Sequence, residues 1–151
     1  MTPDLKARAA LAVELEAMLA DYWHDIDTNW GRNAGAYYTD DAAFIGEAAT
    51  YAGKAKIQEF YAWRVQQGPR LAVHAVNNFR VESIDGDRCR ATWYLLLYAA
   101  NGEPILPTHP PITISLVTDD YVRQADGVWL CQRRLWKTLF QGGAPAHNPK
   151  L

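Results

Sequence analysis

The 151-residue sequence predicts an α+β fold in which a curved β-sheet packs against helices. Residues 11–30 repeat apolar side chains at helical steps of three and four, whereas the sequence from residue 70 onward alternates apolar and polar residues as strands do. No linker and no internal repeat interrupts the chain, and its length suits one hydrophobic core. We therefore expect one domain over residues 1–151.

The first predicted element is a long N-terminal helix. Thr2 is a good N-cap, and a proline follows it at the first helical position. Gly31 is expected to end the helix. The apolar stripe between these limits consists of Leu11, Leu15, Tyr22, Ile26 and Trp30.

The later elements follow in order. A short helical turn leads into a strand at 37–44, and residues 46–53 read as a hairpin. A second helix begins at Lys54 and stops at Gly68-Pro69. Four long strands, expected at 70–84, 88–100, 112–124 and 128–140, complete the sheet. They form two hairpins, which a proline-rich loop at 101–111 separates. Residues 141–151 are expected to form a tail.

Composition excludes several classes of partner. The net charge is -2, and the only basic cluster is Arg133-Arg134, so no nucleic acid is expected. No apolar run is long enough to cross a bilayer, so no membrane partner is expected and the default location is cytoplasmic. Cys89 and Cys131 lack the spacing of metal ligands, so no metal site and no disulfide are predicted.

Asp27 is the first candidate functional residue. It follows Trp23 by four residues and precedes Trp30 by three, so all three share one helix face. A carboxylate among tryptophans needs a partner or a raised pKa. The alternative is that Asp27 caps the helix end or faces water.

His74 is the second candidate. It lies on a strand face with Val76 and Asn78. Alone, such a histidine is more often part of the core, but a carboxylate partner would fix its tautomer and leave the other ring nitrogen as a base. Asp27 could be that partner. His24, three residues before Asp27 on the same helix, competes with His74 for it.

The order of these elements resembles the SnoaL-like branch of the nuclear-transport-factor-2-like superfamily. The similarity runs from about Leu11 to Phe140 and rests on "YYTDDAAFIG", "YAGKAKIQEFY", "LAVHAVNNFRV" and "DGVWLCQRRLWKTLF". The resemblance implies a cone-shaped, strongly curved mixed sheet wrapped around a long N-terminal helix and shorter helices, with an apolar pocket in its open end. Relatives such as scytalone dehydratase, bile-acid 7α-dehydratase and hexachlorocyclohexane dehydrochlorinase are lyases that need no cofactor.

The resemblance also implies residue roles. The aspartate and the catalytic histidine of the family's Asp–His pair fall on Asp27 and His74, a basic residue of the last strand falls on Arg134, and a catalytic tyrosine falls on Tyr22. The dehydrochlorinase has a lysine at this last position, so halide elimination is disfavoured here. From the residues alone, Arg134 could instead stack on its aromatic neighbours.

The six tryptophans and eight tyrosines suit the walls of a pocket. We expect the following residues to bind substrate: Trp23, Trp30, Tyr38, Asn78, Tyr94, Tyr98, His109 and Trp136.

Together these features predict a cofactor-independent lyase. The reaction would be dehydration or C–C cleavage of a hydrophobic, aromatic or polycyclic small molecule, started by proton abstraction. The alternatives are an isomerase, which the same pair would serve, and a non-catalytic ligand carrier or assembly subunit. A homodimer or homotrimer is expected, with Trp93, Leu95 and Leu97 as candidates for an outer contact face.

Overall fold

The computed structural model describes residues 2–142. The predicted tail beyond residue 142 lies outside the described residues. The elements follow the predicted order: α1 (Pro3–Asn29), the 3-10 helix η1 (Ala34–Tyr37), β1 (Tyr38–Ile45), β2 (Thr50–Ala52), α2 (Lys54–Val65), β3 (Arg70–Asp85), β4 (Arg88–Asn101), β5 (Thr113–Arg123) and β6 (Trp129–Gln141).

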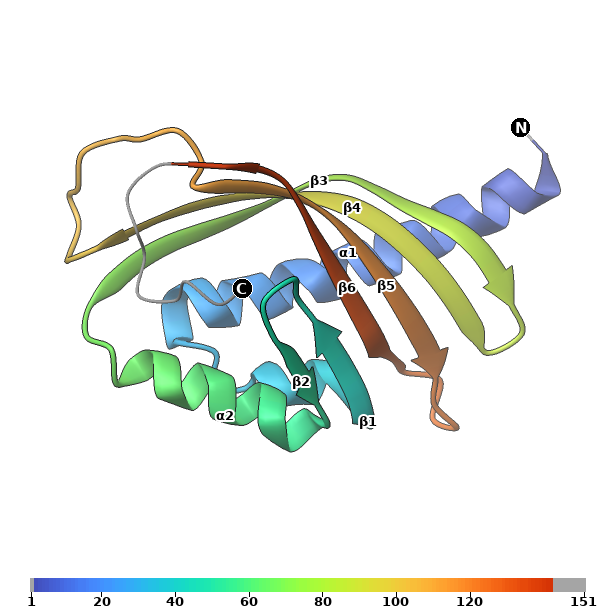
Figure 1. Ribbon diagram of the computed structural model, residues 1–151. Helices are drawn as coiled ribbons and strands as arrows, with labels where there is room; N and C mark the ends of the chain where they lie inside the picture. The colour runs from blue at the N-terminus through green and yellow to red at the C-terminus, as the bar shows by residue number, and fades with distance from the viewer. Residues whose placement is uncertain (1, 143–151) are drawn as a thin grey trace.

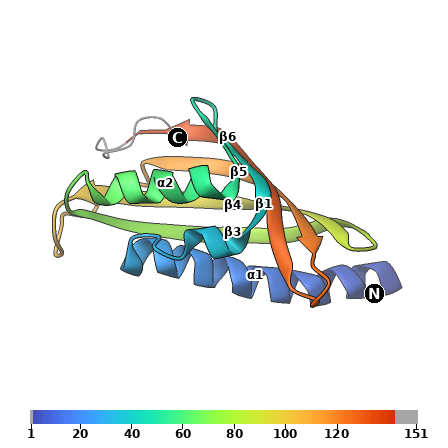
Figure 2. The same ribbon diagram turned by 90° about the horizontal axis from the view of Figure 1, so that it is seen from below.

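The strands form one mixed sheet with the order β2-β1-β6-β5-β4-β3. β1 pairs with β6 in parallel, and the other neighbours are antiparallel. The sheet curves over α1 and α2 without closing (Figures 1 and 2), so β3 is a free edge that runs beside α1. This arrangement confirms the α+β prediction and the strongly curved mixed sheet.

The two ends of α1 are set by local chemistry. The Thr2 side chain accepts a hydrogen bond from the backbone N–H of Leu5 at 3.2 Å. At the other end, Trp30 adopts a left-handed conformation with φ 62°. Gly31 follows with φ 69°, and a Cβ at this position would lie 2.8 Å from the Tyr61 ring. The glycine therefore ends α1 and lets α2 approach it closely.

Alternation along β4 decides which side chains face the helices. Trp93 and Leu95 are 1% and 0% exposed and belong to the core, whereas Tyr94 and Tyr98 are 37% and 39% exposed on the outer face. The prediction that Trp93, Leu95 and Leu97 form an outer contact face is wrong, because these residues belong to the inward set of the strand or pack against the core.

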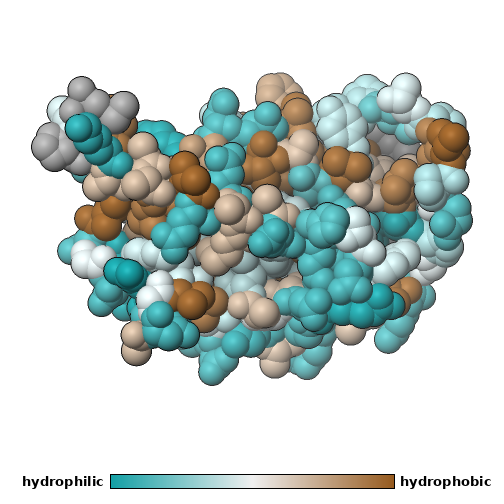
Figure 3. Space-filling model, turned by 180° about the vertical axis from the view of Figure 1, so that it is seen from behind, coloured by the Kyte–Doolittle hydropathy of each residue, from teal (hydrophilic) through white to brown (hydrophobic). Residues whose placement is uncertain are grey.

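The surface carries no continuous apolar stripe on the side shown in Figure 3, where hydrophobic residues are dispersed among hydrophilic ones. Single exposed apolar residues such as Val13 of α1, which is 71% exposed, are normal on a protein surface. Neither helix within residues 2–142 is long and apolar enough to cross a membrane.

Candidate functional site

Asp27 and His74 contact each other at two points. The Nδ1 atom of His74 lies 2.6 Å from Oδ1 of Asp27, and the backbone N–H of His74 donates to Oδ2 at 2.9 Å. The second bond is available because β3 is an edge strand, whose outward N–H groups have no neighbouring strand to bind. The carboxylate of α1 therefore fixes both the backbone and the ring of His74.

A stacked aromatic ring also covers one face of the His74 imidazole. Trp23, one turn before Asp27 on α1, stacks on the imidazole with ring centroids 4.0 Å apart and an interplanar angle of 7°. Because an Asp27 carboxylate can only accept, the ring proton resides on Nδ1 and the lone pair on Nε2. The imidazole is then oriented as a proton acceptor.

Burial lowers the pKa of His74 below its ordinary value of 6.5. The hydrogen bond and the negative charge of Asp27 act in the opposite direction, while the cationic Arg70 and Arg64 lower the pKa further. The side chain of His74 is 10% exposed. His74 is therefore neutral at pH 7, which is the state that a general base requires.

Arg134 has a different role from the predicted one. Its guanidinium binds Asp119 with two hydrogen bonds of 2.8 Å, and both side chains are 0% exposed. It also donates to the hydroxyls of Tyr38 at 3.2 Å and Tyr37 at 3.1 Å. The arginine lies over five aromatic rings, those of Tyr22, Trp23, Tyr37, Tyr38 and Trp93. This geometry corrects the expectation that Arg134 is free to hold a substrate oxyanion.

Tyr22 and Tyr38 belong to the same buried network. The Tyr38 hydroxyl donates to that of Tyr22 at 3.0 Å, and the Tyr22 hydroxyl lies 2.6 Å from that of Tyr61. Burial raises the pKa of all three phenols, so they stay protonated. Because Tyr38 is 0% exposed and bonded to Arg134, it supports the interior. The catalytic role of Tyr22 stays a prediction.

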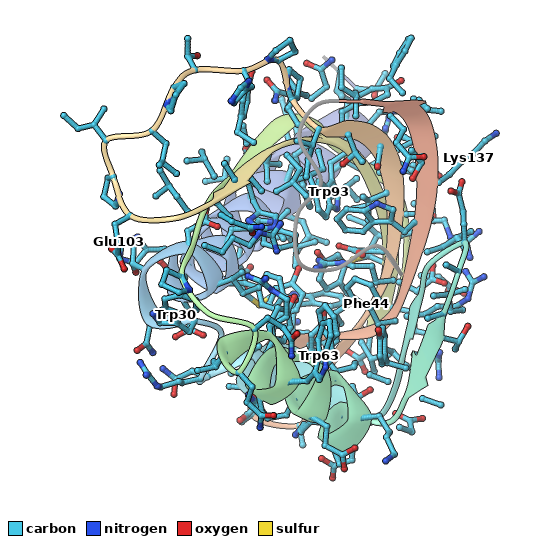
Figure 4. The ribbon with its side chains drawn as sticks, turned by 60° about the vertical axis from the view of Figure 1, so that its left-hand side comes forward. Trp30, Phe44, Trp63, Trp93, Glu103 and Lys137 are labelled. Carbon is cyan, nitrogen blue, oxygen red and sulfur yellow. The ribbon has the colours of Figure 1, made fainter. Side chains whose placement is uncertain are left out.

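Two further predicted residues lie near the pair. Trp136 is 7% exposed, stacks on Phe44 and meets Trp23 edge-on at 6.3 Å. Trp30 lies at the end of α1. In Figure 4, Trp93 lies beneath the arch of the sheet, Phe44 lies nearer α2, and Trp30 marks the neighbouring end of α1. Trp93 and Trp136 thus both contact Trp23, the ring that stacks on His74.

Four predicted substrate-binding residues lie elsewhere. Tyr94 and Tyr98 point to the outer face of β4. His109 is exposed in the loop after β4, where it lines an outer hollow of about 230 Å³ together with Tyr98. Asn78 is exposed at a β-bulge with φ 53°, which breaks the alternation that would have put it beside His74. We therefore remove these residues from the candidate site.

Two arginines that were not among the predicted site residues act on the pair through their charge. Arg70 begins β3 on the same strand face as His74, and Arg64 lies in the last turn of α2. The positive charges of both arginines act to lower the pKa of His74. The spacing of four residues between Arg70 and His74 was the available signal.

Comparison with known proteins agrees with this architecture. No curated protein matches the sequence. Among solved structures, ActVI-ORFA from Streptomyces coelicolor superposes with a TM-score of 0.75 at 18% identity, covering 89% of this chain and 99% of that one. A candidate scytalone dehydratase from Novosphingobium aromaticivorans gives a TM-score of 0.71 at 19% identity, covering 89% of each chain.

At these identities the similar structures establish the fold alone. The family comparison goes further, because the model of the SnoaL-like domain matches residues 7–135, which include both Asp27 and His74. The chain belongs to the SnoaL-like domain family.

Proposed function

We propose that this protein is a cofactor-independent lyase in which His74, oriented by Asp27, removes a proton from a hydrophobic, aromatic or polycyclic small molecule. The observation that carries the proposal is the two-point contact of Asp27 with His74, which leaves the Nε2 lone pair unused by the carboxylate. Membership of the SnoaL-like family supports a small-molecule ligand.

In the proposed reaction, Nε2 of His74 accepts the substrate proton and becomes imidazolium. The adjacent carboxylate of Asp27 stabilises that new charge. The electron pair left on the substrate then expels hydroxide, which becomes water with the proton from His74, or breaks a C–C bond. His74 returns the proton to the leaving group or to solvent, so that the enzyme ends the cycle neutral.

The stacked Trp23 supports this role in two ways. It restricts rotation of the imidazole, so that the base keeps one direction of attack. It also removes water from one face of the ring, which strengthens the interaction with Asp27. A positioned base of this kind contributes on the order of 10²–10⁴-fold to the rate.

The proposal is tested by incubating the protein with a panel of phenolic and polycyclic alcohols and hydroxy ketones in deuterated water. Mass spectrometry then detects loss of water, C–C cleavage or incorporation of deuterium. We expect turnover by the wild type, and a loss of about 10²–10⁴-fold in His74→Gln and in Asp27→Asn. Full activity of His74→Gln would contradict the proposal.

His24→Gln is the matched control, because His24 lies on α1 three residues before Asp27 and is exposed. We expect it to keep wild-type activity. Deuterium incorporation without loss of a fragment would assign the isomerase alternative to the same base. Binding without any chemical change across the panel would instead favour the ligand-carrier alternative.

A further inference from the structure

Arg64 and Arg70 are partly buried arginines, and each has one buried nitrogen atom without a hydrogen-bond partner among residues 2–142. These atoms are Nη1 of Arg64 and Nε of Arg70. Neither side chain forms an ion pair with a carboxylate in that range. Buried guanidinium N–H groups are normally bonded, so these two require an explanation.

Arg134, a buried arginine with a structural role, gives a comparison for the hydrogen bonds of Arg64 and Arg70. Four hydrogen bonds from its guanidinium reach Asp119, Tyr37 and Tyr38. Arg64 and Arg70 have no comparable set. Within residues 2–142, the buried Nη1 of Arg64 and Nε of Arg70 are therefore left to bind a ligand.

Charge around the Asp–His pair is also unbalanced. The negative charge of Asp27 acts on Arg70, but the oxygens of Asp27 already bind the ring and backbone of His74. Burial, and then the charge of Arg64, lower the pKa of Arg70 to about 10. Arg70 therefore stays cationic at neutral pH despite a like charge nearby, and an anion between the two arginines would offset their repulsion.

The elements bring these side chains to one region. Arg70 lies four residues before His74 on the same face of β3, with the buried Ala72 between them. Arg64 follows the buried Tyr61 by three residues in α2, and Tyr61 meets Tyr22 of α1 through their hydroxyls. In Figure 4 the neighbouring Trp63 of α2 and Trp30 of α1 lie at the same end of the molecule.

We propose that Arg64 and Arg70 form an anion subsite that binds a carboxylate of the substrate and places its acidic C–H bond beside Nε2 of His74. The substrate class is then an aromatic or polycyclic carboxylic acid. Guanidinium groups suit this ligand, because their planar N–H donors match the two oxygens of a carboxylate. The position of the C–H bond rests on the proposed function, whereas carboxylate binding does not.

The subsite is tested by measuring the binding of two probes that share a naphthalene ring. One is the anion naphthalene-2-carboxylate, and the other is its neutral analogue naphthalene-2-carboxamide. By calorimetry at neutral pH, we expect the wild type to bind the carboxylate at least about tenfold more tightly than the amide. Equal affinities, a preference for the amide, or failure of the wild type to bind the carboxylate would each overturn the proposal.

Variants then assign the effect to the two side chains. The double variant Arg64→Gln/Arg70→Gln should lose about tenfold or more in carboxylate affinity and leave amide affinity unchanged. Arg70→Lys keeps the charge and should retain part of the preference. The control Arg80→Gln alters an arginine of β3 whose side chain is 65% exposed, and it should match the wild type. An unchanged preference in the double variant would overturn the subsite.

His74→Gln separates this proposal from the proposed function. This variant should still prefer the carboxylate while losing turnover of the panel compounds. If His74→Gln binds the carboxylate normally and keeps turnover, His74 is not the base, but the anion subsite of Arg64 and Arg70 is supported. If the wild type turns over only neutral compounds and shows no preference for the carboxylate, the anion subsite of Arg64 and Arg70 is contradicted, but His74 as the base is not.

Discussion

Neutralising Asp119 should destabilise the protein strongly, because Asp119 is the counter-ion of the buried Arg134. Its two oxygens accept four hydrogen bonds: from Trp93 at 3.0 Å, from Tyr121 at 2.8 Å, and from the Nε and Nη2 atoms of Arg134 at 2.8 Å each. In Asp119→Asn, the new amide group would face N–H or O–H donors, and the arginine would lose its opposite charge.

The size of the effect follows from this burial. Removing one partner of a buried ion pair costs about 3–5 kcal/mol, since the remaining charge is left uncompensated. With a urea dependence of about 2 kcal/mol per molar, the unfolding midpoint should fall by roughly 2 M. Circular dichroism in urea at neutral pH measures this midpoint directly.

The neighbouring residue supplies the control. Asp120 binds Arg90 through two hydrogen bonds of 2.7 and 3.2 Å, but the two side chains are 27% and 50% exposed. An exposed pair of this kind contributes about 0–1 kcal/mol. Asp120→Asn should therefore be nearly neutral. If Asp119→Asn costs no more than Asp120→Asn, the structural role assigned to Arg134 is refuted.

Four further outcomes are expected. Because burial lowers the pKa of His74, activity should rise with pH with a midpoint below the ordinary value of 6.5; a rate that falls with rising pH in this region would contradict a neutral base. The unfolded chain binds the His74 proton more readily, so the stability of the wild type relative to His74→Gln should increase with pH up to about 6.5 in urea titrations. Trp23→Leu removes the stacked ring and should lower kcat more than it raises KM, with unchanged kcat disproving the orienting role. Sedimentation should show a dimer or trimer that Tyr98→Lys weakens, and a wild type that is only monomeric would remove that expectation.

The faces that carry Asp27 and His74 could be predicted from the sequence because both residues lie in regular elements, whereas the choice of His74 over His24 as the partner of Asp27 came from the family resemblance. A four-residue step on a helix puts Asp27 and Trp23 on one face, and strand alternation turns His74 away from Val73, which is 51% exposed. The distances between the atoms of the two residues, in contrast, needed the structure. The catalytic role of the pair remains a prediction.

Failures of the sequence prediction have local causes. A one-residue error in alternation moved Trp93 and Leu95 to the outer face of β4 in the prediction, because both faces of that strand carry apolar residues. A β-bulge moved Asn78 out of register, and bulges leave little trace in a sequence. In both cases the deciding information is the pairing between strands.

The polar interior was harder to predict. Asp119 stands directly opposite Arg134 in the pairing of β5 with β6. A carboxylate in the apolar stripe of β5, between Val117 and Tyr121, was the available sign of a buried ion pair. Without the register of the two strands, Arg134 could equally have faced a ligand.

The central claim is that Asp27 holds His74 as a neutral base with its lone pair on Nε2. Nitrogen-15 NMR of the histidine rings at pH 7, with His74→Gln to assign the signal, measures this state directly. We predict a protonated Nδ1 and an unprotonated Nε2 in the wild type, and loss of that single tautomer in Asp27→Asn. A proton on Nε2 of His74 at pH 7, or a tautomer that Asp27→Asn leaves unchanged, would contradict the claim.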